Sequence, residues 1–357
     1  MKKIGILTFQ KAHNYGAILQ CYALQEFLLS AGYEVKIIDY TPKWMIKGYG
    51  YLNYRLYNPL HPKSAIQNIL ALTKRINRYK SFDKFINTYL ILSDKKRLNL
   101  IYEDFDIVII GSDQVWNPKE TKQYDSFYWG NFKHEGKPYI ISYAASMGGA
   151  VQSANWSIIN EYLKNFDLIS VREKYLAMEI YKRCKRQAKW VIDPTLLHTS
   201  DFWIKKATPI KIKEPYLFFY QARANKEAVE YAQNVAKRLN LKFIAMSAYI
   251  LSINSKESIK ANPFDFLGLI NKSSYVITTS FHATVFCIQF KKQFISLKLN
   301  DGEDGRSATL LNLMKLQDRQ RDLKQDITMK DIDWTKAINN LEPIVNESKR
   351  FLYDAIK

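Results

Sequence analysis

Several polar stretches of the sequence could carry chemistry, and each directly follows a run of apolar residues. The stretch ITTSFHATVF contains His282, whose imidazole can give or take a proton near neutral pH. The stretch IIGSDQVWNP contains Asp113, between Ser112 and Gln114, and its carboxylate could accept a proton from a substrate hydroxyl or orient that hydroxyl. A histidine at a helix start that is satisfied by the backbone is the alternative for the first stretch, and an Asx-turn and helix cap is the alternative for the second.

Two arginines could hold an anion. Arg172 in SVREKY lies where an apolar segment gives way to a helical pattern, and Arg306 in DGEDGRSATLL lies in a glycine-flanked segment before another helical pattern. A planar, permanently charged guanidinium suits a carboxylate or a phosphate. A surface ion pair, for Arg172 with Glu173, is the alternative. Taken with His282, these residues predict a cationic cleft that contains one histidine.

The stretch QKAHNYGAILQ places Asn14, Tyr15 and Gly16 at the expected start of a helix. Free backbone N–H groups and the positive end of the helix dipole suit a phosphate, a carboxylate or sugar hydroxyls. Plain N-capping by Asn14 is the alternative. The pattern is not GxGxxG, so it predicts no dinucleotide site.

Continuous apolar runs alternate with helical patterns along the chain, which is typical of parallel strands covered on both faces. We therefore predict an α/β protein with two Rossmann-like domains that face each other across a cleft. The expected parts are an N-terminal domain at 1–205 with a basic helical insertion at 41–100, a C-terminal domain at 206–334, and a final helix at 335–357 that can pack back on the first domain. Ligands of such sheets bind beyond the carboxyl ends of the strands.

The charge distribution also bears on partners. The 357-residue chain has a formal net charge of +19, and residues 41–100 hold twelve Lys or Arg against two Asp, with Trp44, Tyr49, Tyr51, Tyr54 and Tyr57 interleaved. This combination suits an anionic membrane surface or a polyanion, and a solvated basic helix is the alternative. The sequence contains no RNA-binding motif that would support nucleic acid as the partner.

The cysteines and the apolar runs indicate a compartment. The three cysteines, Cys21, Cys184 and Cys287, are widely spaced and form no CxxC pair, which favours reduced thiols and no metal site. No run of about 18 apolar residues is present, so nothing is expected to span a membrane. We expect a cytoplasmic protein, with peripheral contact with the inner face of the membrane as an option.

The motifs together resemble the polysaccharide pyruvyl transferase family. They are HNYGAILQCYALQEFL, DFDIVIIGSDQVWNP, SYAASMG, SVREKY, VIDPTLL and SFHATVFCIQF, and they occur in order over most of residues 3–320. The resemblance implies a glycosyltransferase-B-like fold, no metal and no cofactor. It also implies transfer of a pyruvyl group from phosphoenolpyruvate to two hydroxyls of a bacterial cell-surface saccharide or its lipid-linked precursor, which forms a cyclic ketal.

The resemblance also assigns residues. It implies that the donor is held by the arginine of the REK motif, here Arg172, and by an Arg-x-His motif whose histidine is here His282. The arginine of that motif is replaced by Ser280, and Arg306 or Lys291 could supply the missing cation. The predicted catalytic residues are His282, Asp113 and Arg172. The predicted donor-binding residues are Arg172, Ser280, His282 and Arg306, and the predicted acceptor-binding residues are Asn14, Tyr15, Gly16, Ser112, Gln114 and Trp116.

Two other functions fit the same patterns. A nucleotide-sugar-dependent glycosyltransferase of the same architecture would need an acidic residue for the ribose in the second domain, and GEDG at 302–305 is a weak candidate. A non-catalytic protein that binds a saccharide or a membrane surface would need no histidine at position 282.

Overall fold

The structure is a computed structural model. It describes residues 1–45, 72–132, 135–136, 138–248, 253–256, 261–327 and 330–357. Part of the predicted basic insertion, residues 46–71, lies outside the described residues. Among the helices that are described, none combines the length and the apolar character needed to cross a membrane.

The first domain is built on a parallel four-stranded sheet with the order β2-β1-β3-β4. Its strands are β1 (Lys3–Leu7), β2 (Glu34–Ile37), β3 (Ile107–Ile110) and β4 (Tyr139–Ser142). A two-stranded parallel sheet, β5 (Ser170–Val171) and β6 (Lys189–Trp190), continues it beyond β4. Its helices are α1 (Tyr15–Ser30), α4 (Leu72–Tyr89), α5 (Ile101–Asp104), α6 (Trp156–Leu163) and α7 (Lys174–Cys184).

The second domain has a parallel five-stranded sheet with the order β11-β10-β9-β7-β8. Its strands are β7 (Tyr216–Gln221), β8 (Lys242–Ser247), β9 (Tyr275–Thr278), β10 (Phe294–Lys298) and β11 (Gln320–Asp322). Its helices are α8 (Ser200–Lys206), α9 (Lys226–Arg238), α10 (Pro263–Lys272), α11 (Phe281–Gln289) and α12 (Gly305–Leu313). All six residues of β7 are buried, as expected for a central strand covered on both faces.

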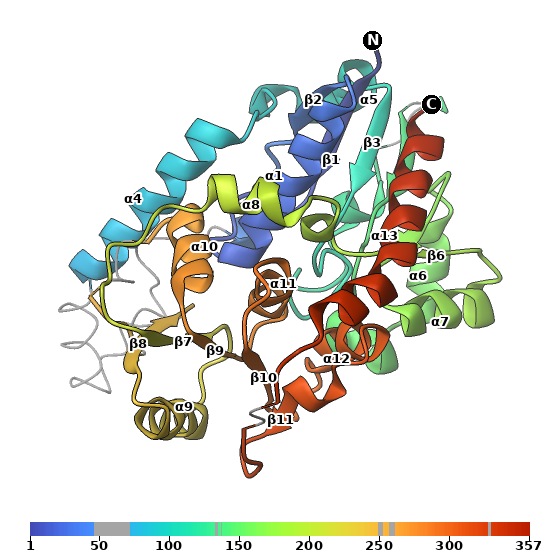
Figure 1. Cartoon of the computed structure of the whole chain (residues 1–357). Coiled ribbons are helices and arrows are strands. Elements are labelled where there is room, and N and C mark those ends of the chain that lie inside the picture. Colours follow the sequence, from blue (N-terminus) through green and yellow to red (C-terminus); the bar gives the residue numbers. More distant parts are fainter. Residues whose placement is uncertain (46–71, 133–134, 137, 249–252, 257–260, 328–329) are drawn as a thin grey trace, which may run out of the picture.

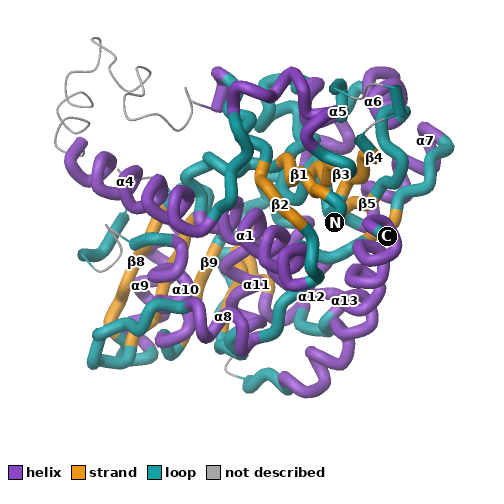
Figure 2. Tube along the Cα trace, turned by 90° about the horizontal axis from the view of Figure 1, so that it is seen from above, coloured by secondary structure: helices purple, strands orange, loops and turns teal. Residues whose placement is uncertain are grey.

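The last helix, α13 (Trp334–Ile356), runs beside elements of the first domain, and its C-terminal end lies close to the N-terminus of the chain (Figures 1 and 2). The hydroxyl of Ser348 accepts a hydrogen bond from the backbone N–H of Ile192, and Glu347 lies 2.9 Å from Lys189. These contacts join the end of the chain to the segment around β6.

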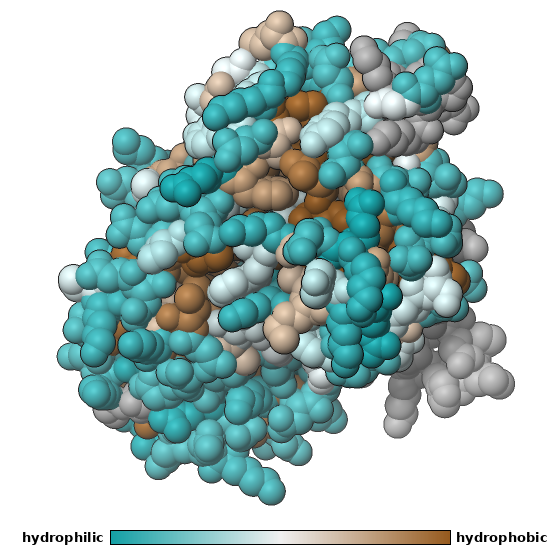
Figure 3. All heavy atoms as spheres, turned by 90° about the vertical axis from the view of Figure 1, so that its right-hand side faces the viewer, coloured by the Kyte–Doolittle hydropathy of each residue, from teal (hydrophilic) through white to brown (hydrophobic). Residues whose placement is uncertain are grey.

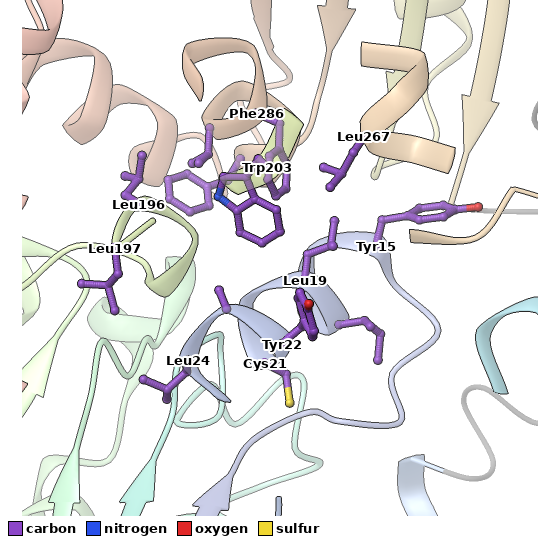
Figure 4. Close-up of a cluster of buried hydrophobic side chains, with 14 of the residues drawn as sticks. Tyr15, Leu19, Cys21, Tyr22, Leu24, Leu196, Leu197, Trp203, Leu267 and Phe286 are labelled. Atoms are coloured by element: carbon purple, nitrogen blue, oxygen red, sulfur yellow. The ribbon is translucent and has the colours of Figure 1, made fainter. Parts of the chain in front are cut away.

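Helix α1 connects the two domains. It is buried on nearly all sides because the first sheet covers one side and helices of the second domain cover the other. Leu19 and Tyr22 of α1 belong to a buried apolar cluster with Trp203 of α8, Leu267 of α10 and Phe286 of α11 (Figure 4). The two domains therefore share one core at this point.

Candidate active site where the two domains meet

A group of charged side chains lies where the loops of both domains converge beside this shared core. The loops after β3, β5 and β6 carry Asp113, Arg172 and Asp193, and the first turn of α11 carries His282. Parallel strands present their carboxyl ends at one edge of a sheet, so three residues far apart in sequence reach the same place. We call the group formed by these four residues, together with Glu173, Glu303 and Arg306, the interdomain charge cluster.

Asp193 is the centre of the cluster. Its side chain is fully buried, and its Oδ2 atom lies 2.8 Å from Arg172 Nη1 and 3.4 Å from His282 Nε2. The Oδ1 atom accepts hydrogen bonds from the backbone N–H and the hydroxyl of Thr195. The hydroxyl of Ser112 lies 3.4 Å from Oδ2 and donates to it. One carboxylate therefore joins two residues of the first domain to a histidine of the second.

The surroundings of Asp193 and Arg172 determine the protonation state of both side chains. Burial alone raises the pKa of Asp193, but His282 and Arg172 outweigh that effect and hold its pKa well below the ordinary value. Burial lowers the pKa of Arg172, and Asp193, Glu173 and Asp113 together raise it further than burial lowers it. Asp193 and Arg172 are therefore both charged at neutral pH, as a compensated buried ion pair requires.

Arg172 has further contacts. Its Nη2 atom lies 3.5 Å from Asp113 Oδ1 and its Nε atom lies 3.6 Å from Glu173 Oε1. Its guanidinium carbon lies 5.0 Å from the ring centroid of Phe281. Among the described residues, Arg172 Nε is buried and donates no hydrogen bond, so this N–H could serve a bound anion.

Glu173 is the buried acid beside Arg172. Its Oε1 atom accepts a hydrogen bond of 2.6 Å from the hydroxyl of Ser146. Burial raises the pKa of Glu173, and Arg172 and the Ser146 hydroxyl only partly oppose this effect.

Arg306 also packs against the ring of Phe281. Its guanidinium carbon is 5.8 Å from the centroid of Phe281, and its Nη2 atom lies 3.0 Å from Glu303 Oε2. Burial, and then the nearby charge of Arg172, lower the pKa of Arg306. Its Nε atom is buried and has no hydrogen-bond partner in the part of the chain that the structure describes.

Glu303 joins the second domain to the first. Its Oε2 atom accepts a hydrogen bond of 3.3 Å from the side-chain amide of Gln114, and its Oε1 atom accepts one of 3.2 Å from the backbone N–H of Gly149. The loop before α12 is also held by Arg223, whose Nη2 atom lies 2.7 Å from Asp304 Oδ1. The predicted residues Gln114 and Arg306 therefore meet through a carboxylate.

Gly16 lets His282 approach α1. A Cβ atom added at Gly16 would lie 2.1 Å from His282 Nδ1, far inside van der Waals contact. Only a residue without a side chain fits between the first turn of α1 and the imidazole. The sequence analysis predicted that Gly16 binds the acceptor, and the structure places it against the predicted catalytic histidine.

Asn14 and Ser280 cap the two helices that meet here. Asn14 accepts hydrogen bonds from the N–H groups of Gly16 and Ala17, and Ser280 accepts one from the N–H of Ala283. These contacts correspond to the capping alternative. Ser280, which stands where the resemblance implies an arginine, caps α11 and carries no charge. Arg306, the predicted substitute cation, lies inside the cluster.

Two of the predicted acceptor residues are core side chains. Tyr15 is fully buried, its hydroxyl donates to the carbonyl of Ala261, and its ring stacks on Phe266 at 4.9 Å. Trp116 is 1% exposed and stacks on Trp129 at 4.6 Å. Neither ring offers a surface to a saccharide in this structure.

The cluster holds more acid than the sequence analysis expected. Asp193 and Glu173 were not predicted as site residues, and Glu303 was considered only within GEDG as a weak ribose-binding candidate for the competing glycosyltransferase. These three acids face Arg172 and Arg306. With four carboxylates against two arginines and one histidine, the cluster is a mixed ionic network and not the predominantly cationic cleft that the sequence predicted. Asp193 follows a buried apolar run directly, as Asp113 does, so the same rule of strand ends could have found it.

No group of three or more His, Cys, Asp or Glu among the described residues is arranged to hold a metal ion. The carboxylates of the cluster form their ion pairs with Arg172, Arg306 and His282.

Comparisons with known proteins agree with this architecture. A family model described as polysaccharide pyruvyl transferase matches residues 14–301. The UDP-GlcNAc 2-epimerase of Neisseria meningitidis, solved with UDP-GlcNAc, is similar with a TM-score of 0.51 and 10% identity, over 100% of this chain and 99% of that one. This likeness shows the fold, which is that of two Rossmann-like domains in a glycosyltransferase-B-like arrangement.

Two further solved structures are less similar. The UDP-GlcNAc 2-epimerase of Methanocaldococcus jannaschii has a TM-score of 0.49 and 13% identity, over 97% of this chain and 93% of that one. The glycosyltransferase SsfS6 of Streptomyces sp. SF2575 has a TM-score of 0.47 and 11% identity, over 99% and 100%. A search of curated protein sequences gave no significant match.

Proposed function

Because this chain belongs to the polysaccharide pyruvyl transferase family, we propose that it transfers a pyruvyl group from phosphoenolpyruvate to two hydroxyls of a saccharide and releases phosphate. The observation that carries the proposal is the convergence of Arg172 and His282 on one oxygen of Asp193 where the two domains meet. An anion-binding guanidinium and a proton-transferring imidazole are the two groups that this reaction needs side by side.

The donor would be held by the arginines. Phosphoenolpyruvate carries a carboxylate and a phosphate, and the Nε–H groups of Arg172 and Arg306, whose guanidinium groups both pack against the Phe281 ring, are buried without a hydrogen-bond partner among the described residues. Donors fixed in a buried place stabilise charge that develops on a leaving group better than donors in water do. We assign the departing phosphate to these two guanidinium groups.

The proton transfers would involve His282 and Asp113. The methylene carbon of the donor takes a proton from the imidazolium of His282, and this makes the neighbouring carbon electron-poor. A sugar hydroxyl attacks that carbon and gives its proton to Asp113. The C–O bond to phosphate then breaks, and the phosphate leaves with the bonding electron pair and takes the proton from Asp113. The second hydroxyl attacks the same carbon and gives its proton to the neutral imidazole of His282, which closes the ketal and restores both side chains. Positioned groups of this kind each contribute about 10²–10⁴-fold to the rate.

The experiment is turnover with phosphoenolpyruvate and a galactose-bearing saccharide. Release of phosphate and a mass gain of one pyruvyl ketal on the saccharide are expected from the wild-type protein. Arg172→Ala and His282→Gln are expected to lower the rate by at least about 10²-fold. His198→Gln is the matched control, because His198 is also partly buried but contacts the carbonyl of Ala23 and the ring of Phe202. Undiminished turnover in the first two variants would refute the assigned site.

A nucleotide-sugar-dependent glycosyltransferase is the competing function on the same fold. In a thermal-shift comparison, phosphoenolpyruvate is expected to stabilise the protein more than UDP-GlcNAc at equal concentration, since only a ligand that binds the folded state raises the melting temperature. The reverse order would favour the competing function.

We also propose that the acceptor is a bacterial cell-surface saccharide or its lipid-linked precursor in the cytoplasm.

A further inference from the structure

The outward face of α7 is apolar along its centre. Tyr175, Met178 and Tyr181 are 43%, 60% and 54% exposed, and their spacing of three residues puts them on one side of the helix. Among the described residues, eleven large apolar side chains are exposed, and three of these belong to this one helix of 11 residues. Helix α7 therefore carries a local strip of exposed apolar side chains on one face.

Lysines flank this apolar strip. Lys174, Lys182 and Lys185 are exposed and lie next to the strip at helical spacing. Residues 174–189 contain six Lys or Arg and a single acid, Glu179, which is a net charge of +5. Glu179 is buried, and its Oε2 atom lies 2.6 Å from Arg183 Nε, so it places no acid on the outward face.

The helix is fixed in this orientation. Leu176 and Ile180 on its inner side are buried in the core of the first domain, and α7 lies at the outer edge of the molecule (Figure 1). The surface on that side of the molecule is mostly hydrophilic (Figure 3). Because the helix is already folded and anchored, a partner would bind it without the cost of ordering a segment.

We propose that this face of α7 binds the surface of an anionic phospholipid bilayer. A helix that lies at a membrane interface typically has an apolar strip flanked by basic residues. Here Tyr175, Tyr181 and Met178 would enter the headgroup region. The lysines beside them would contact lipid phosphates while their aliphatic stems cover apolar surface. Charge complementarity selects an anionic bilayer over a neutral one.

This surface lies next to the interdomain charge cluster. Glu173 directly precedes α7, and the hydroxyl of Tyr175 accepts a hydrogen bond of 2.6 Å from Gln152 in the 3-10 helix η4 (Gly148–Ser153), whose Gly149 contacts Glu303. A protein bound through α7 would therefore hold the cluster close to a lipid-linked acceptor. That consequence rests on the proposed function, whereas the membrane contact itself does not.

Co-sedimentation with vesicles tests the contact. Vesicles of equal parts phosphatidylglycerol and phosphatidylcholine are expected to bind the full-length protein, and vesicles of phosphatidylcholine alone are expected not to bind it. The triple variant Met178→Ser, Lys182→Gln, Lys185→Gln is expected to bind at least about 25-fold more weakly, because each lysine near an anionic surface contributes about fivefold. High salt is expected to weaken binding of the wild-type protein, since it screens these contacts.

A matched control is available on α8 and the segment that follows it. Ile204 is 46% exposed, and Lys205 and Lys211 are exposed as well. The variant Ile204→Ser, Lys205→Gln, Lys211→Gln removes the same charge and a similar apolar side chain, and it is expected to bind anionic vesicles as the wild type does.

Four outcomes would overturn the proposal. These are no binding of the wild type to anionic vesicles, equal binding by the wild type and the α7 variant, an equal loss in both variants, or binding of polygalacturonate but not vesicles through the same face. Phosphate release with a soluble saccharide, measured in parallel, separates this proposal from the proposed function. The α7 variant is expected to keep that activity. If the wild-type protein binds anionic vesicles but releases no phosphate, only the transferase assignment is contradicted.

Discussion

The substitution Asp193→Asn tests the centre of the interdomain charge cluster. Asparagine has nearly the same shape, and its side-chain oxygen can still accept the hydrogen bonds that Asp193 Oδ1 takes from Thr195. The variant therefore removes the negative charge that lies 2.8 Å from Arg172 and 3.4 Å from His282, and little else.

The expected loss of stability follows from the burial of the pair. Removing one partner of a buried ion pair costs about 3–5 kcal/mol, because the other charge is left uncompensated. Asp113 at 3.5 Å and Glu173 at 3.6 Å still face Arg172, so we expect the lower end, about 3 kcal/mol. Urea unfolding followed by circular dichroism measures this free energy of unfolding.

The pH dependence gives an independent check. The pKa of Asp193 in the folded protein lies below its ordinary value of 3.8, so its contribution to stability is present above that pH and is lost as the pH falls towards the folded pKa. The stability difference between wild type and Asp193→Asn is therefore expected to shrink as the pH falls below about 4.

The control is Asp106→Asn. Asp106 accepts a hydrogen bond from the backbone N–H of Lys3 near the surface, and it is expected to lose no more than about 0.5 kcal/mol on substitution. The reasoning would be refuted if Asp193→Asn were as stable as Asp106→Asn, or if its deficit persisted unchanged in acid.

Three further substitutions give distinct readouts. Gly16→Ala places a Cβ atom 2.1 Å from His282 Nδ1 and must displace the imidazole by about 1 Å, so kcat is expected to fall on the order of a hundredfold, and an unchanged kcat would contradict the assigned histidine. Glu173→Gln removes an acid whose pKa is raised above 4.5 by burial, so the wild type loses stability as the pH rises through that raised pKa. The Tm of the variant relative to wild type is therefore expected to increase with pH. A pH-independent difference in Tm would argue against the buried acid. Trp116→Ala is expected to cost about 3–5 kcal/mol in unfolding experiments and to leave KM for the saccharide unchanged, since the indole stacks on Trp129 in the core; a raised KM in the folded variant would restore its predicted role in acceptor binding.

The local pattern of the sequence was sufficient for the architecture and for the position of several site residues. Apolar runs such as IVII at 107–110 and YLFFYQ at 216–221 are buried strands, and the polar residues that follow strands do gather at the edge where the domains meet. This works because strand burial and the gathering of carboxyl ends depend on short-range periodicity and on the parallel topology.

The sequence by itself determined two Rossmann-like domains and the proximity of Asp113, Arg172 and His282 at their contact. Only the tertiary structure decided the partners: Asp193 as the shared carboxylate, Glu303 as the acid on Arg306, and Gly16 as the residue that makes room for His282. The physical reason is that capping and burial are local properties of the chain, whereas an ion pair or a close contact depends on the distance between atoms brought together by separate elements.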